Sequence, residues 1–251
     1  VMDHQAVDVA AMMAGIVGAE PGKYNYFAEM ETAGKCFEWV KDHLVLDEVN
    51  VYLAKTDVAE SRETVYESLY DYMSDTVAKV APGSGGVLFT PWLHGNRCPF
   101  EDSAAAGMFF NLRLETGKAQ MLRAVLEGIC FHLRWMLEVQ EKKTKTSDPI
   151  RFVGGGALSP VTCQMLADIT GRTIETVENT KDVGAIGAAM LAAVGSGAFA
   201  SLSDAAKLVA VNGTYRPDPA NKAVYDRNFR VFRKLYAANK ENFAILNRLE
   251  G

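Results

Sequence analysis

The feature that most constrains this sequence is a run of three consecutive glycines at positions 154–156. Residues 150–153 before it, Ile-Arg-Phe-Val, are typical of a short strand. Ser159 and Pro160 after it favour the N-cap and the first position of a helix. Glycines at such a joint leave the backbone open to a ligand, and the helix start offers unpaired N–H groups to an anion. From spacing alone, a phosphate- or nucleotide-binding turn and a tight turn without a ligand explain the stretch equally well.

The residues around this run predict the class of fold. The helix that begins at Pro160 ends where Gly171 fits a C-terminal cap, and residues 173–177 alternate as a strand does. Asp182 is a candidate N-cap for a further helix, which ends near Gly195. Strand, helix, strand and helix in this order predict an α/β domain with a parallel or mixed sheet and crossover helices.

The rest of the chain adds further expected elements. Turn residues at 20–23 suggest two helical segments within residues 1–45. Apolar periodicity predicts helices at 61–79 and 118–141, and a strand at 87–89. The final helix, residues 219–249, carries a 4–3 apolar repeat. That repeat fits either a coiled-coil seam or a helix docked on its own domain, and the short repeat favours docking. No repeat or linker divides the chain, so one domain is expected.

Composition excludes several classes of function. The net charge is −5 and no cluster of Lys and Arg forms a basic patch, so no nucleic acid partner is expected. No apolar run approaches the ~20 residues of a membrane helix, so no membrane partner is expected either. The four cysteines show no C-x-x-C spacing, which favours reduced, buried thiols and a cytoplasmic protein.

No established catalytic signature is present. The chain lacks a P-loop, a nucleophile elbow and a metal-binding H-E-x-x-H motif. His94 is more typical of a structural or solvated loop residue than of a general base. Asp168 is more typical of an exposed or capping residue than of a base. Glu101 and Asp102 are adjacent on a loop, so they are not expected to converge on one reacting atom. The small residues at 184–189 favour close packing of a helix on the sheet over contact with a ligand.

Three ordered blocks nevertheless carry a specific resemblance. Together they resemble the C-terminal domain of FGGY carbohydrate kinases, over residues 88–195, and are most similar to xylulose kinases and related pentulose kinases. Tyr24 to Tyr26, Ala33-Gly34 and Trp39 extend the similarity toward the start of the chain. The blocks are LFTPWLHGNRCPF at 88–100, RAVLEGI at 123–129, and GGGALSP at 154–160 with GAIGAA at 184–189.

The resemblance implies a ribonuclease-H-like domain of the actin-like ATPase type, an α/β fold with a mixed sheet flanked by helices. It implies that residues 1–251 are the C-terminal nucleotide-binding domain of a sugar kinase, with the N-terminal domain absent. It also implies ATP and Mg²⁺ as cofactors and a cleft that a sugar enters between two domains. The residues implied to bind the nucleotide are Gly155, Gly156, Ala157 and Ser159 on one side, and Gly34, Phe37 and Glu38 on the opposite helix. The helix around 184–193 would connect the two domains.

The sequence departs from the family pattern where phosphoryl transfer needs protein groups. The family's Asp-x-Gly-Thr loop, its Gly-Thr-Ser loop and the catalytic aspartate have no counterpart here, since Asp3 and Asp8 lie in a different context. We therefore expect no catalytic residue and no metal ligand in this chain, and phosphorylation of D-xylulose to D-xylulose 5-phosphate only by the full-length protein. The alternatives are a kinase for another pentulose or polyol and a non-catalytic actin-like nucleotide-binding or scaffold module. The sequence leaves open whether the protein forms a homodimer.

Overall fold

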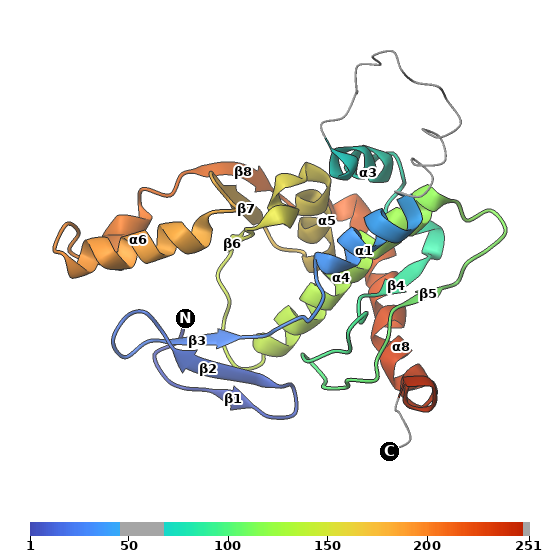
Figure 1. The fold of residues 1–251 in the computed structure, drawn as a ribbon, viewed down its shortest axis with the longest axis horizontal. Coiled ribbons are helices and arrows are strands. Elements are labelled where there is room, and N and C mark those ends of the chain that lie inside the picture. Colours follow the sequence, from blue (N-terminus) through green and yellow to red (C-terminus); the bar gives the residue numbers. More distant parts are fainter. Residues whose placement is uncertain (46–67, 248–251) are drawn as a thin grey trace, which may run out of the picture.

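The long helix α4 (Lys118–Gln140) is the centre of the fold in a computed structural model that describes residues 1–45 and 68–247. It confirms the helix expected at 118–141. Residues 122–132 are all buried, and a helix that is covered all round lies in the interior of a domain. Helices α1 (Lys35–Val40), α3 (Leu69–Ala78), α5 (Pro160–Thr170) and α8 (Lys222–Asn247) all pack on it (Figure 1).

Gly128 lets a strand approach α4 closely. Strand β4 (Leu88–Thr90) pairs with β5 (Met108–Phe110) and crosses α4 here. A Cβ built on Gly128 would lie only 2.2 Å from the carbonyl oxygen of Phe89. The glycine in the second block of the resemblance therefore serves helix–strand packing.

A mixed sheet carries the glycine run. Strand β6 (Ile150–Arg151) runs parallel to β7 (Ile174–Val177), and β7 pairs antiparallel with β8 (Val211–Tyr215). Helix α5 crosses from β6 to β7. Helices α6 (Val183–Gly195) and α7 (Leu202–Ala206) join β7 to β8. The predicted order of strand, helix, strand and helix is confirmed, and with it the mixed α/β class.

The caps of α5 are those expected from the sequence. The Ser159 hydroxyl accepts a hydrogen bond from the Thr162 N–H at 3.3 Å, and Pro160 takes the first helical position. Gly171 ends the helix in the left-handed conformation, with φ of 69°. Asp182 is the N-cap residue of α6, as expected, but its side chain makes no capping hydrogen bond.

The first part of the chain is a sheet rather than a pair of helices. Strands β1 (Val7–Asp8), β2 (Met13–Val17) and β3 (Tyr24–Phe27) form an antiparallel meander. The turn at 20–23 was recognised, but it closes a β-hairpin. β-branched and aromatic residues on either side of that turn favour strands. The only helix of the expected pair is α1, which continues into a π-helical turn (Lys41–Val45). Helix α3 begins at Leu69, and the first part of the helix expected at 61–79 lies outside the described residues.

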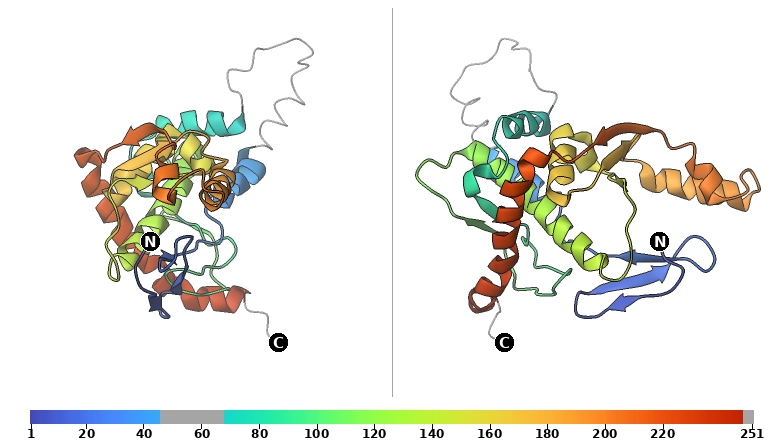
Figure 2. Two further views of the ribbon diagram at one scale, coloured as in Figure 1. Left: turned by 90° about the vertical axis from the view of Figure 1, so that its left-hand side faces the viewer. Right: turned by 180° about the vertical axis from the view of Figure 1, so that it is seen from behind.

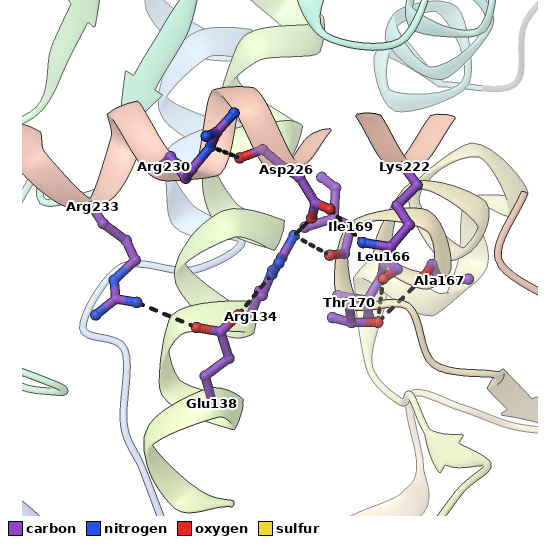
Figure 3. A network of polar contacts seen from close by, with 10 residues as sticks. All are labelled: Arg134, Glu138, Leu166, Ala167, Ile169, Thr170, Lys222, Asp226, Arg230 and Arg233. Carbon is purple, nitrogen blue, oxygen red and sulfur yellow. Dashed lines mark hydrogen bonds and ion pairs between the residues drawn. The ribbon is translucent and has the colours of Figure 1, made fainter. Parts of the chain in front are cut away.

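Helix α8 docks on its own domain, as expected. Its buried residues are Tyr225, Asn228, Phe229, Phe232, Leu235 and Phe243. Polar contacts fix it to α4 and α5 through Arg134 (Figure 3). The Arg134 guanidinium donates to the Ile169 carbonyl at 3.1 Å and to Asp226 at 2.7 Å, and it lies over the Phe229 ring at 4.2 Å. Arg134 thus joins three helices.

Helices α6 and α7 project away from this body (Figures 1 and 2). No residue of α6 is buried, and a Cβ at Gly184 or Gly187 would meet nothing within 4 Å. The close helix–sheet packing expected for residues 184–189 is therefore wrong. Within the described part of the chain, α6 contacts α7, but that contact buries none of its residues.

The four cysteines, Cys36, Cys98, Cys130 and Cys163, are buried free thiols, which confirms the burial expected for them. In the described part of the chain, no helix combines the length and apolar character needed to cross a membrane.

Candidate functional site

The glycine run forms an exposed turn between β6 and α5. Gly154 has φ of 88° and ψ of −169°, a conformation open essentially to glycine alone. The 3-10 turn Gly155–Leu158 follows and leads into α5. A Cβ at Gly154 or Gly155 would meet nothing within 4 Å. The backbone here is thus bare on its outer side, and a ligand could lie directly against it.

Gly156 and Ala157 have contacts within the chain. A Cβ at Gly156 would lie 2.9 Å from the Phe152 ring, so a larger residue there would have to displace that ring. Ala157 is buried, and its carbonyl accepts from the Cys163 thiol at 3.6 Å. Of the two predicted glycines in this turn, Gly155 therefore has its outer face free for a ligand, whereas Gly156 faces Phe152.

The start of α5 is partly satisfied by its own cap. Because Ser159 accepts from the Thr162 N–H, its hydroxyl is engaged within the helix rather than presented to a ligand. An uncapped helix start would attract phosphate more strongly. This turn is consequently better suited to a flat, uncharged group such as a base or ribose than to a phosphate chain.

A residue that sequence reasoning missed holds the turn. The Gly154 N–H points to Thr180, 3.0 Å from its carbonyl oxygen and 3.0 Å from its hydroxyl oxygen. Thr180 is 5% exposed and lies just before α6. It is 26 positions away from Gly154 and belongs to no motif, so no local signal in the sequence marks it.

The second predicted group lies at the start of α1. Gly34 is its N-cap residue, is exposed, and has open space where a Cβ would be. Glu38 pairs with Lys35 at 2.6 Å. Phe37 is only 9% exposed and belongs to the hydrophobic core, with its ring 6.3 Å from that of Tyr70.

Both α1 and α5 pack on α4, so one helix supports the two predicted groups. Gly34 and Gly155 each present bare backbone. Phe37, in contrast, is mostly covered by residues of its own domain.

Two polar residues that the sequence analysis had examined turn out to be structural. Asp168 is buried, and its carboxylate accepts hydrogen bonds from Gln164, from the Asp218 N–H and from Asn221, each at 2.8 Å. The expectation of an exposed or capping residue was wrong, because Asp168 ties α5 to the segment before α8.

Asp102 caps the Ala104 N–H at 3.0 Å and accepts from the Tyr236 hydroxyl, while Glu101 is exposed. As expected, these two carboxylates do not converge. His94 is exposed on its loop.

The residues present fit a nucleoside better than a metal. Bare backbone at Gly34 and Gly155 leaves room for a base or ribose. Among residues 1–45 and 68–247, no three His, Cys, Asp or Glu side chains gather as metal ligands would.

Comparison with known proteins places this chain in a family. The family model described as the C-terminal domain of FGGY carbohydrate kinases matches residues 1–196. The chain belongs to the FGGY family of carbohydrate kinases. Members of this family are phosphotransferases that use ATP.

Relatives of this FGGY domain act on more than one sugar. A xylulose kinase of Lactococcus lactis is 36% identical over 185 residues, which are 72% of this chain and 36% of that protein. A ribulokinase of Anoxybacillus flavithermus is 29% identical over 233 residues, 89% of this chain and 40% of that protein. The ligand-bound crystal structure of xylulose kinase from Lactobacillus acidophilus matches with a TM-score of 0.79 and 25% identity, covering 97% of this chain and 45% of that one. The chain thus spans less than half the length of these relatives.

Proposed function

We propose that this chain is the nucleotide-binding C-terminal domain, residues 1–251, of an ATP-dependent sugar kinase. The observation that carries the proposal is the bare backbone of the glycine turn, above all at Gly155, in a domain of the FGGY family. The adenosine part of ATP would lie against this turn on one side and against the start of α1, at Gly34, on the other. Mg²⁺ would come with ATP in the full-length enzyme and take its ligands outside the described residues.

For the substrate we propose a ketopentose, with D-xylulose phosphorylated to D-xylulose 5-phosphate. The xylulose kinase relative supports this sugar. The ribulokinase relative covers more of the chain at lower identity and favours another pentulose as the second candidate. Formation of ADP by the full-length kinase, measured with D-xylulose, ribulose and gluconate as acceptors of the phosphoryl group, separates these substrates by their kcat/KM.

We further propose that α6 faces the other half of the kinase. Its thirteen residues carry no charge, and none is buried within this chain. Helices α6 and α7 also border an apolar pocket of about 330 Å³, lined in part by Ile186, Met190 and Phe199. Exposed apolar surface of this kind marks an interaction site. Such a kinase would be a cytoplasmic protein. Light scattering on the full-length enzyme tests whether it is also a homodimer.

The nucleotide site is tested by titrating ATP and adenosine against the 251-residue chain and following amide chemical shifts. Half of a cleft buries little of a ligand, so we expect a dissociation constant of about 1 mM, or ~−4 kcal/mol. Shifts should centre on residues 154–159, with adenosine nearly as effective as ATP. Gly155→Val should abolish them without harming the fold, because its Cβ would enter open space.

Gly187→Val is the matched control, since Gly187 also has open space around it but lies on α6. This control should leave binding unchanged. Shifts that map elsewhere, or full binding by Gly155→Val, would show that the site assignment is wrong.

Because the base and phosphate loops are absent, the purified chain should show no sugar-dependent ATP turnover. Turnover with D-xylulose by this chain alone would contradict that part of the proposal.

A further inference from the structure

We infer that Thr180 is a positioning residue of the nucleotide site, which sets the course of the backbone through the glycine turn. This inference rests on the proposed function, because it assigns Thr180 a part in holding the surface on which adenosine would lie. Thr180 itself would not contact the nucleotide. It would act through Gly154.

The geometry of Gly154 shows why the turn needs an external restraint. Its φ of 88° and ψ of −169° lie in a region that glycine enters freely but also leaves freely. No atom lies within 4 Å of the position that a Cβ would take there, so packing on that side does not hold the residue. Its N–H ties the first residue of the turn to Thr180.

Thr180 supplies two acceptors for that one N–H. The backbone oxygen and the hydroxyl oxygen of Thr180 are each 3.0 Å from the Gly154 nitrogen. The carbonyl would be present in any residue, whereas the hydroxyl requires Thr or Ser. A bifurcated bond to a buried residue restricts the orientation of the Gly154 peptide more than a single bond does. The side chain at position 180 therefore contributes separately to the shape of the turn.

Thr180 also lies at the junction with α6. The Asp182 N–H donates to the Asn179 carbonyl at 2.8 Å and closes the turn that contains Thr180. Helix α6 begins at Val183, directly after this turn. The same residue is thus connected to the glycine turn through hydrogen bonds and to α6 through the chain, which places it between the nucleotide site and the surface proposed to face the other half of the kinase.

The test compares Thr180→Val and Thr180→Ser in the full-length kinase. Valine keeps the branched shape and the backbone carbonyl but lacks the hydroxyl, and serine restores it. We expect Thr180→Val to raise the KM for ATP about fivefold to tenfold, the effect of weakening one buried hydrogen bond. The KM for the sugar and kcat should stay within about twofold, and Thr180→Ser should behave like the wild type.

Thr176→Val is the control for a structural role. Thr176 is buried on β7, and its hydroxyl donates to Asn212 of β8 at 2.7 Å rather than to the glycine turn. Both valine variants should lower the melting temperature to a similar extent, but only Thr180→Val should change the KM for ATP. If Thr180→Val changes only the melting temperature, as Thr176→Val does, the inference is overturned.

A third variant separates this inference from the proposed function. If Gly155→Val raises the KM for ATP while Thr180→Val does not, the nucleotide site stands and Thr180 has no part in it. If Gly155→Val has no effect on the use of ATP, the glycine turn is not the nucleotide site, and the role of Thr180 is overturned together with it.

Discussion

Arg123 and Glu127 lie one turn apart on α4 and form a buried ion pair, with 2.8 Å between Nε and Oε1. The same carboxylate accepts the Gly83 N–H and the Ser84 hydroxyl, each at 2.8 Å. Gly83 and Ser84 both have left-handed backbones, with φ of 90° and 51°. The guanidinium also donates to the Tyr225 hydroxyl at 2.8 Å. One charge pair therefore joins α4, α8 and an unusual loop before β4.

Removing the negative charge of this pair should destabilise the fold strongly. Glu127→Gln would leave the Arg123 guanidinium buried without a counter-charge, so we expect the free energy of unfolding to fall by about 3–5 kcal/mol. Urea denaturation of the chain measures this change. Glu138→Gln, on the same helix but partly exposed in its pairs with Arg134 and Arg233, should cost about 1 kcal/mol or less. Equal effects of the two substitutions would contradict the argument.

Gly128 should resist even the smallest substitution. In a helix, alanine is normally more favourable than glycine by about 1 kcal/mol. At this position, however, the added methyl group would meet the Phe89 carbonyl, and overpacking costs about 1–3 kcal/mol. We expect Gly128→Ala to lower the melting temperature, whereas Gly187→Ala on α6 should raise it or leave it unchanged. A stabilised Gly128→Ala variant would mean that β4 does not approach α4 this closely.

His132 should make the fold sensitive to acid. Its Nδ1 accepts from the Trp92 indole N–H at 3.2 Å, and its Nε2–H donates to the Cys98 carbonyl at 2.7 Å. Burial lowers the pKa of His132 from 6.5 to about 4. The unfolded chain thus binds the proton more readily than the folded chain. The contribution of neutral, buried His132 to the free energy of unfolding is therefore complete above pH 6.5 and is lost as the pH falls toward 4.

Between pH 7 and pH 5 the free energy of unfolding should fall by about 2 kcal/mol because of His132. Urea denaturation at the two pH values measures it, and His132→Phe should reduce the difference. His94→Gln, on an exposed loop, should keep the difference seen in the wild type. An unchanged pH dependence in His132→Phe would show that another group causes the effect.

Helix α6 should tolerate polar substitution in the isolated chain but not in the full-length kinase. Leu191 is 47% exposed, so Leu191→Lys should change the free energy of unfolding of this chain by less than about 0.5 kcal/mol. In the full-length enzyme, the same lysine would enter the interface proposed for α6 and should lower both thermal stability and activity. Leu114→Lys, on a loop where Leu114 is 98% exposed, should be neutral in both. Equal tolerance of Leu191→Lys in both proteins would contradict the proposed interface.

Local sequence signals determined the elements whose ends and faces are encoded by neighbouring residues. Ser159, Pro160 and Gly171 marked both ends of α5, and the glycine run marked the joint before it. The family was recognisable because several short blocks keep their order along the chain. These features can be recognised in the sequence because capping, turn formation and helical periodicity each depend on only a few neighbouring residues.

The tertiary structure decided what those elements touch. It showed that β2 and β3 form a hairpin, that Asp168 is a buried hydrogen-bond acceptor, and that no residue of α6 is buried. It also showed that Gly156 faces Phe152 and that Thr180 holds Gly154. Contacts of this kind join residues distant in sequence, and their energies depend on burial and direction. The Thr180 hydroxyl is 26 positions away from Gly154, so the sequence alone does not indicate their contact.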